Sequence, residues 1–273
     1  MTAALEVTDL SVSFGGLVAL DGVSIDVGHG ELVGLIGPNG AGKTTLIDAV
    51  SGFTSTTRGN VRLGDRPLDD LSPTERARAG LARTFQSVEL FEELSVRENL
   101  MVSADRPRWW SWLADLVRGS DAGVAARVDD ALGLLELEGL EEARPSELSQ
   151  GQRKLVGVAR AFAASPSVLL LDEPAAGLDS KESERLGCQL RAIAEQGIGL
   201  LLIDHDMGLV LSACERLHVL DFGREIARGT PNEVRRDPAV TRAYLGEEGR
   251  QEFAELQGRG VDEIVLPAEG EER

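Results

Sequence analysis

The first residues of this sequence whose types and spacing indicate chemistry form a glycine-rich run that ends in lysine and threonine. Residues 37–44 read Gly-Pro-Asn-Gly-Ala-Gly-Lys-Thr and fit the pattern G-x-x-x-x-G-K-[ST]. Glycines let a loop curl so that successive N–H groups face an anion at a helix N-terminus, where the helix dipole also favours negative charge. Lys43 adds a positive charge, and the Thr44 hydroxyl is an oxygen ligand that Mg²⁺ accepts. The run therefore predicts a site for the phosphates of a nucleotide.

A strand before this run and a helix after it would hold the loop in place. Residues 32–36 are apolar, and apolar residues recur over 46–50, so the context is strand, glycine loop and helix. A glycine-rich turn that merely joins a strand to a helix is the alternative. We expect the nucleotide to contact the loop and the start of the helix, which are Gly37, Pro38, Asn39, Gly40, Ala41, Gly42, Lys43, Thr44 and Thr45.

A second predicted strand ends in two adjacent carboxylates. Residues 168–171 are continuously apolar, as in a parallel strand buried on both faces, and Asp172 and Glu173 follow directly. Ligands of open α/β sheets bind at the carboxyl ends of the strands. We therefore expect Asp172 to bind Mg²⁺ and Glu173 to polarise an attacking water. The alternative is that both are ordinary solvated loop residues.

A third candidate site lies at the start of a predicted helix that continues to residue 163. Ser149 followed three residues later by Gln152 is capping-box chemistry, and Gly151 lies between them. A serine hydroxyl, a glycine amide and a helix N-terminus together suit a γ-phosphate. The same residues would also make a plain capped helix, but their position just before the acidic strand favours the phosphate role.

Hydrophobic patterning predicts an α/β fold. Residues 5–14 and 19–27 alternate around a Gly-Gly pair, which predicts two antiparallel strands at the start of the chain. The later apolar runs alternate with helical patterns, which favours a mostly parallel sheet. These later segments are a strand over 200–203 and helices over 181–196 and 206–214. The expected fold is therefore a parallel core with an antiparallel N-terminal subdomain.

A helical subdomain is predicted as an insertion into this core at about 87–160. No strand pattern occurs between residues 87 and 149, where apolar residues recur at three- and four-residue steps. The expected helices cover 95–104, 109–117 and 124–137. Residues 247–273 are acidic and broken by glycine and proline, so we expect a flexible tail after a single domain over 1–246.

Composition excludes several classes of protein. The chain of 273 residues has 46 acidic and 28 basic residues, a net charge of -18 and a pI near 4.6, which disfavours nucleic acid as a main partner. Its two cysteines and three histidines lack the spacing of a disulfide framework or a zinc site, which favours a reducing compartment. No apolar run approaches the roughly 18–20 residues of a membrane span, and the start does not resemble a signal peptide. We expect a protein that is neither secreted nor integral to a membrane.

The order of these motifs resembles the ATP-binding cassette (ABC) family. Residues 148–152, Leu-Ser-Gln-Gly-Gln, resemble the signature usually written LSGGQ, with Gln150 at the first glycine position. The resemblance implies a P-loop NTPase fold, ATP and Mg²⁺ as ligands, and ATP hydrolysis. It also implies four further roles: Phe14 stacks on adenine, Gln86 touches Mg²⁺ and water, Asp179 lies in the D-loop, and His205 contacts the γ-phosphate as the switch histidine.

The same resemblance implies partners, because the chain carries one copy of each motif. In the family two cassettes pair head to tail and each supplies its signature to the ATP of the other, which implies a homodimer or a heterodimer. It also implies transmembrane permease subunits that dock on the region 86–151, of which 91–100 resembles part of the docking groove. A substrate-binding protein would act indirectly. The expected location is the cytoplasmic side of the cell membrane.

A narrower resemblance is to the ATPase subunits of branched-chain amino acid importers. Residues 14–23, the inserted segment around Trp109 and Trp112, and the closing residues 243–246 carry it, and it covers about 2–246. Importers of this type usually pair two different cassettes, which favours a heterodimer. Urea or short-amide importers and lipopolysaccharide exporters stay as alternatives, as does a soluble ABC ATPase without a transport role. The signature and His205 disfavour a P-loop kinase.

Overall fold

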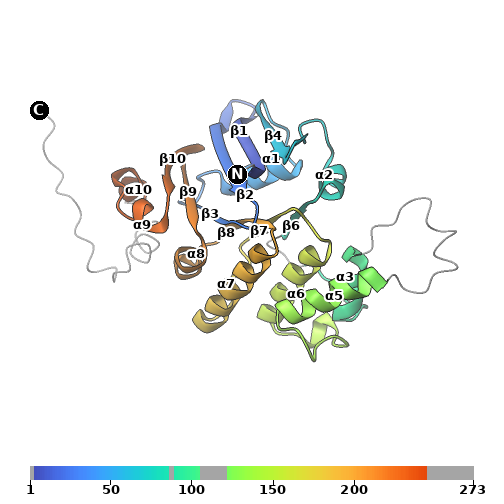
Figure 1. Ribbon diagram of the computed structural model, residues 1–273. Helices are drawn as coiled ribbons and strands as arrows, with labels where there is room; N and C mark the ends of the chain where they lie inside the picture. The colour runs from blue at the N-terminus through green and yellow to red at the C-terminus, as the bar shows by residue number, and fades with distance from the viewer. Residues whose placement is uncertain (1–2, 86–88, 105–121, 245–273) are drawn as a thin grey trace, which may run out of the picture.

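Two sheets form the frame of the molecule in a computed structural model that describes residues 3–85, 89–104 and 122–244 (Figure 1). The first sheet is antiparallel and has the strand order β2-β1-β4-β5. Its strands are β1 (Ala3–Phe14), β2 (Leu17–Gly28), β4 (Arg58–Leu63) and β5 (Arg66–Pro67). The expected N-terminal hairpin is confirmed, with Phe14 paired to Leu17 at its tip.

The second sheet has six strands in the order β10-β9-β3-β8-β7-β6. All neighbours pair in parallel except β10 and β9, which form an antiparallel hairpin. The strands are β3 (Leu32–Ile36), β6 (Leu81–Arg83), β7 (Val168–Asp172), β8 (Gly199–Ile203), β9 (Arg216–Asp221) and β10 (Arg224–Gly229). Because β3, β7, β8 and β9 are parallel, their carboxyl ends share one edge of the sheet, where ligands of such folds bind.

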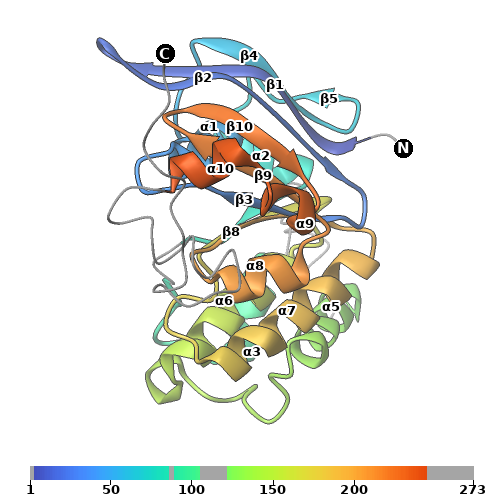
Figure 2. The same cartoon turned by 90° about the vertical axis from the view of Figure 1, so that its left-hand side faces the viewer.

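Helices cover both faces of the six-stranded sheet. They are α1 (Lys43–Ser51), α2 (Pro73–Ala79), α3 (Val96–Ala104), α5 (Ala122–Leu134), α6 (Gln150–Ala163), α7 (Ser180–Glu195), α8 (Met207–Ala213), α9 (Pro231–Val234) and α10 (Pro238–Ala243), with a 3₁₀ turn at Pro145–Glu147. Figure 2 shows the antiparallel sheet on one side of the six-stranded sheet and α3, α5, α6 and α7 on the other. Among the described helices, none combines the length and apolar character that crossing a bilayer requires.

Strand alternation divides the core into two clusters. Val168 and Leu170 of β7 pack with α1 and the antiparallel sheet, whereas Leu169 and Leu171 pack with the helices on the opposite face. Every residue of β3, β7 and β8 is buried, which explains their continuously apolar sequences. The predicted α/β class, with a mostly parallel sheet and an antiparallel N-terminal part, is confirmed.

The helical predictions differ from the structure at their ends. The helix expected over 124–137 ends at Leu134, because Glu136 turns the chain with a φ of 54°. Leu135 and Leu137 stay buried beyond the helix end, which is why the apolar pattern continues past it. The helix expected over 109–117 and the tail 247–273 lie outside the described residues, and the division at residue 246 stays a prediction.

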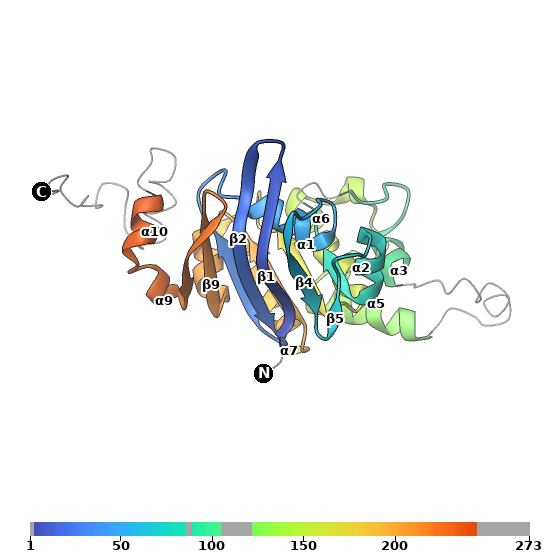
Figure 3. The same ribbon diagram turned by 90° about the horizontal axis from the view of Figure 1, so that it is seen from above.

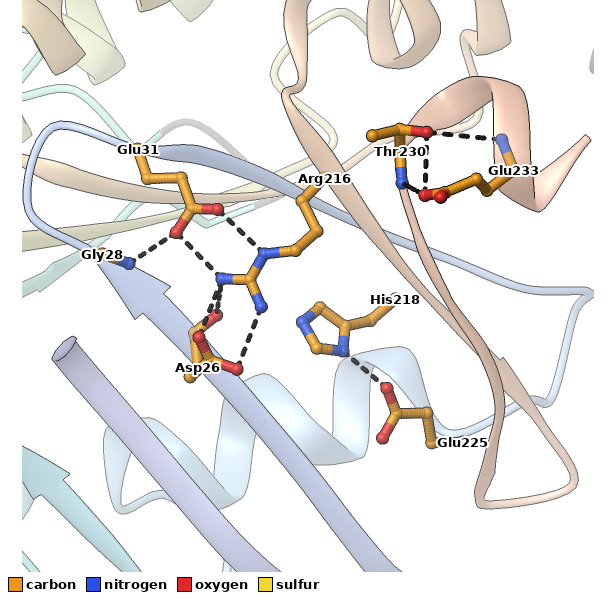
Figure 4. A network of polar contacts seen from close by, with 8 residues as sticks. All are labelled: Asp26, Gly28, Glu31, Arg216, His218, Glu225, Thr230 and Glu233. Carbon is orange, nitrogen blue, oxygen red and sulfur yellow. Dashed lines mark hydrogen bonds and ion pairs between the residues drawn. The ribbon is translucent and has the colours of Figure 1, made fainter. Parts of the chain in front are cut away.

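An ion-pair network joins the two sheets at β9 and β2 (Figure 4). The Arg216 guanidinium donates to both carboxylate oxygens of Asp26, at 2.8 and 2.9 Å, and to both of Glu31, at 2.9 Å each. Hydrogen bonds from Arg216 lower the pKa of Asp26. Burial alone would raise the pKa of Glu31, but hydrogen bonds from Arg216 and Gly28 hold it below its ordinary value. Sequence patterning predicted neither this network nor the β9–β10 hairpin beside it.

Candidate functional site

The glycine loop has a backbone that other residues would strain. Gly37, Gly40 and Gly42 have φ values of 152°, 79° and 104°. A Cβ on Gly37 would lie 2.1 Å from the backbone oxygen of Leu220, and a Cβ on Gly42 would lie 2.8 Å from Leu20 Cδ2. The loop is therefore pressed between β9 and β2, and glycine is required at both positions.

The start of α1 is built differently from the other helix starts whose caps are known. Its N-cap is Gly42, which offers no side-chain acceptor to the amides of the first turn. In contrast, α2, α6, α7, α8, α9 and α10 each begin with a side-chain cap. Thr44 lies in this first turn and is exposed. An anion at this end would accept the hydrogen bonds that a capping side chain accepts elsewhere.

Lys43 places its charge inside the loop. The side chain is buried, and Nζ donates to the carbonyl oxygens of Gly37 and Pro38, the latter at 3.1 Å. Ala41 N–H also donates to Pro38 O at 3.1 Å, which closes the loop on itself. The amine therefore lies where it can approach an anion held by the loop.

Asp172 ends β7 and is held by an arginine from the neighbouring strand. Its Oδ2 accepts from Arg83 Nη2 at 3.1 Å, and both side chains are more than 90% buried. Arg83 also donates to Asp48 Oδ1 at 2.6 Å, on the helix that follows the glycine loop. Asp172 N–H donates to Thr84 Oγ1 at 3.2 Å. Arg83 thus connects the acidic strand to α1, a role that hydrophobic patterning does not predict.

Glu173 and His205 come together although 32 residues separate them. His205 Nε2 and Glu173 Oε1 lie 2.8 Å apart. The contact arises because β7 and β8 are parallel neighbours with Asp172 opposite Ile203, so the residues that follow them are adjacent. Glu173 has a φ of 49°, and its N–H donates to Ile203 O at 2.8 Å. This left-handed backbone is the kind of strain that concentrates at functional sites.

A buried carboxylate fixes the loops on either side of this pair. Asp204 accepts from Ala175 N–H and from Asp206 N–H, each at 2.9 Å. Burial raises the pKa of Asp204 above its ordinary value, against the effect of these hydrogen bonds. Asp206 caps α8 through Leu209 N–H at 3.0 Å and accepts from the Ser183 hydroxyl of α7. The loops that carry Glu173 and His205 are therefore tied together.

The start of α6 is satisfied by its own residues. Ser149 Oγ accepts from Gln152 N–H at 3.2 Å, and Gln152 Oε1 accepts from Ser149 N–H at 2.8 Å. The cap uses the serine hydroxyl as an acceptor, so its proton can be donated to a ligand. Gly151 is buried, and a Cβ there would lie 2.7 Å from Leu178 Cδ2.

Gln150 also contacts the segment that includes Asp179. A Cβ on Gly177 would lie 3.2 Å from the Gln150 amide, so this side chain covers that glycine. Asp179 caps α7 in a second capping box with Glu182. The start of α6 and the 177–179 segment of the same chain therefore form one packed unit.

The predicted residues do not all meet in one chain. The glycine loop, Asp172, Glu173 and His205 all lie at the carboxyl edge of the six-stranded sheet. However, α1 packs on one face of that sheet and α6 on the other. Phe14 is 55% exposed at the end of β1, so it is not a core residue. Gln86 lies outside the described residues.

A cavity of about 920 Å³ opens between the sheet and the helical region. Phe53, Phe85 and Phe91 line it and are each about half exposed. Arg83 lies over the Phe85 ring, with 4.9 Å between its Cζ and the ring centroid. The cavity thus reaches the side chain that holds Asp172.

Comparisons with known proteins agree with this geometry. The family model described as ABC transporter matches residues 20–176, and a model described as branched-chain amino acid ATP-binding cassette transporter matches residues 224–250. The chain is 39% identical over 249 residues to the high-affinity branched-chain amino acid transport ATP-binding protein LivG of Salmonella typhimurium, with 89% of this chain and 98% of that protein covered. It is 37% identical over 251 residues to the lipopolysaccharide export system ATP-binding protein LptB of Escherichia coli, with 91% and 99% covered.

Solved structures show the same fold. An ATP-binding cassette of an ABC transporter in its ADP conformation superposes with a TM-score of 0.79 at 31% identity, over 90% of this chain and 100% of that one. A dimeric bacterial ABC transporter cassette superposes with a TM-score of 0.69 at 26% identity, over 83% and 98%. The family match, the identity to these relatives and the shared fold lead to one conclusion: the chain belongs to the family of ATP-binding, ATP-hydrolysing subunits of ABC transporters.

Proposed function

We propose that this chain is the ATP-hydrolysing subunit of a membrane transporter that imports branched-chain amino acids. The observation that carries the activity is that the glycine loop and the Glu173–His205 pair lie at the same edge of the sheet. The match of residues 224–250 and the identity to LivG support the choice of solute. Lipopolysaccharide export is the second candidate, because LptB is nearly as similar as LivG.

The loop and the start of α1 bind the phosphates of ATP. Backbone amides of the first turn and the Lys43 amine supply the hydrogen bonds and the positive charge. Mg²⁺ in such sites usually takes one or two carboxylates and completes its shell with phosphates and water. The hydroxyl of the exposed residue Thr44 and the Asp172 carboxylate fit as its protein ligands, and Gln86 is a third by resemblance. When bound, Mg²⁺ supplies charge neutralisation at the phosphates.

Glu173 accepts the proton of the attacking water, and His205 holds the Glu173 carboxylate in place. The 2.8 Å contact between His205 Nε2 and Glu173 Oε1 fixes one oxygen of the carboxylate. The proton of the water is proposed to pass to this carboxylate. By resemblance, His205 also contacts the γ-phosphate.

The second half of each site comes from another cassette. Because α1 and α6 pack on opposite faces of one sheet, Ser149 of the same chain does not cap the nucleotide bound at α1. A head-to-tail pair with a second cassette, identical or different, brings Ser149, Gly151 and Gln152 to that nucleotide. The 177–179 segment, including Asp179, moves with them because it packs on α6.

Permease subunits dock in the cavity lined by Phe53, Phe85 and Phe91. Its aromatic walls suit an amphipathic helix, and its contact with Arg83 connects it to Asp172. Docking there would place the protein at the cytoplasmic face of the membrane, and a substrate-binding protein would act through the permease. No nucleic-acid partner is proposed.

The test is reconstitution with the membrane permease subunits and the binding protein encoded beside this chain. We expect ATP-dependent uptake of leucine, isoleucine and valine, and no uptake with Lys43→Ala. For Lys43→Ala we expect ATP affinity to fall about 10- to 100-fold, the size of a charged hydrogen bond. If the subunits encoded beside this chain extract lipopolysaccharide and support no amino acid uptake, the second candidate is favoured. ATP binding without any permease association would contradict both.

A further inference from the structure

Phe222 combines two features that are unusual for a large apolar residue. It lies in the two-residue turn between β9 and β10 with a φ of 41°, in the left-handed region, and its side chain is 87% exposed. Gly223 has a φ of 76°, so both turn residues have positive φ, as in a type I′ turn, where Asn-Gly is preferred. A phenylalanine at this position has a strained backbone, and its side chain is not buried in the protein. Neither property stabilises the fold, which points to a role in binding a ligand.

The turn is bonded directly to the glycine loop. Gly223 N–H donates to Ala41 O at 2.9 Å, and Gly223 O accepts from Asp21 N–H at 2.8 Å. Arg224 adds an ion pair to Asp21 at 2.6 Å. A Cβ on Gly223 would lie 2.4 Å from Ala19 O, so the turn is pressed against β2. Phe222 is therefore carried by a rigid support that contacts the phosphate-binding loop itself.

Phe14 lies at the same end of the same core cluster. Val12 and Leu220 are fully buried in the cluster that contains Ala41, and Phe14 and Phe222 each follow one of them by two residues. β9 runs parallel to β3, whose end leads into the glycine loop, so Phe222 lies at the edge where that loop opens. Figure 3 shows the β1–β2 turn and the β9–β10 turn directed to the same side of the molecule.

We propose that Phe222 is a second aromatic contact for the base of the bound nucleotide, beside Phe14. The ligand is a nucleoside triphosphate whose phosphates lie on the loop and whose purine ring contacts Phe222. The proposal rests on the proposed ATP binding at this loop and extends it to base selectivity. Stacking of one base on an aromatic side chain changes affinity roughly 5- to 100-fold. A purine has a larger ring than a pyrimidine and buries more apolar surface in such a contact, so we expect the contact to favour purines.

The test replaces Phe222 by a residue that suits the turn. Phe222→Asn fits a type I′ turn, so we expect an unchanged or higher melting temperature without nucleotide. Titration calorimetry should show ATP affinity reduced about 5- to 10-fold and affinity for inorganic tripolyphosphate within twofold of the parent. Phe222→Tyr, which keeps the ring, should restore ATP affinity.

Comparing the affinity for ATP with the affinity for tripolyphosphate shows which proposal fails if the result differs from the expected one. Equal loss of ATP and tripolyphosphate affinity would show that the turn only supports the loop, which overturns the proposal. Unchanged ATP affinity in Phe222→Asn would overturn it as well. If the parent chain binds neither ligand, the proposed function fails instead. The ratio of ATP to CTP affinity gives a further readout, because it should fall in Phe222→Asn if the ring contacts the base.

Discussion

The N-terminus of α1 and the N-terminus of α6 are built in opposite ways, although both are proposed to face the phosphates of a nucleotide. The α1 end has Gly42 as its N-cap and lies in a loop pressed between two strands. The α6 end is exposed and closed by its own Ser149–Gln152 capping box. No side chain caps the first turn of α1, whereas the first turn of α6 is capped by residues of its own helix.

This difference between the two helix ends implies that nucleotide binding and ATP hydrolysis have different structural requirements. A helix end whose amides lack a side-chain acceptor gains most from an anion, so the α1 end should bind nucleotide in a single chain. In a single chain the capping box already satisfies the start of α6. This end can still donate the Ser149 hydroxyl proton and the Gly151 amide to a nucleotide bound on another chain. Nucleotide binding should therefore be a property of one chain, and hydrolysis a property of two.

The largest expected effect comes from Glu173→Gln, which keeps both helix ends and removes the base. A general base contributes about 10²- to 10⁴-fold, so we expect turnover to fall by that factor while ATP affinity is kept. The closed pair should then accumulate with ATP. Radiolabelled ATP hydrolysis and size-exclusion chromatography measure both. Turnover within threefold of the parent would reject Glu173 as the base.

A smaller effect is expected from Ser149→Ala, which changes the α6 end alone. Loss of a hydroxyl that bonds a charged phosphate should lower turnover about 10- to 100-fold and leave ATP affinity of the isolated chain unchanged. The matched control is Thr230→Ala, which removes the same kind of capping box from α9, a helix that does not line the cavity proposed for the permease. Equal turnover in the two variants would mean that Ser149 is only a helix cap.

Gln150→Gly should have a still smaller effect. Gln150 covers Gly177 of its own chain, whereas Ser149 and Gly151 are the residues proposed to meet the phosphate. We expect turnover of the assembled transporter to stay within about tenfold of the parent, which is 1.4 kcal/mol. A larger increase would show that this side chain hinders closure of the pair.

Arg216→Met should change stability rather than chemistry. Arg216 lowers the pKa of Asp26 and helps to lower that of Glu31. Its contribution to the free energy of unfolding is therefore fully present above the ordinary pKa values of these carboxyl groups, near pH 4. This contribution is lost as the pH falls through their lowered pKa values. We expect a loss of roughly 1–2 kcal/mol at pH 7, discounted for partial exposure, that shrinks below about pH 4. Denaturant unfolding at several pH values measures it. The exposed Arg58–Asp9 pair provides the control, since Arg58→Met should cost less.

The sequence alone predicts those parts of the candidate site whose residues are close together along the chain. The glycine loop, the strand before Asp172 and the start of α6 are each read from a few consecutive residues with strand and helix patterns beside them. Their positions in the fold agree with those expectations. The roles of the individual residues stay predictions.

Contacts between distant segments could not be predicted in the same way. The Glu173–His205 contact depends on the order of β7 and β8 in the sheet, and the Arg83–Asp172 pair on the place of β6. Phe222 was missed because its turn lacks the Asn-Gly sequence that marks a hairpin. Such features follow from strand order, which hydrophobic periodicity does not specify.

The most direct test of the shared site is complementation between two impaired variants at a protein concentration where the parent hydrolyses ATP as a homodimer. In a mixed dimer of Ser149→Ala and Glu173→Gln chains, one site combines an intact Glu173 with an intact Ser149 from the other chain, while the second site carries both changes. The account predicts that mixing restores about a quarter of parent turnover, because half of the dimers are mixed and each has one complete site. Turnover of the mixture equal to the mean of the two separate variants would contradict it.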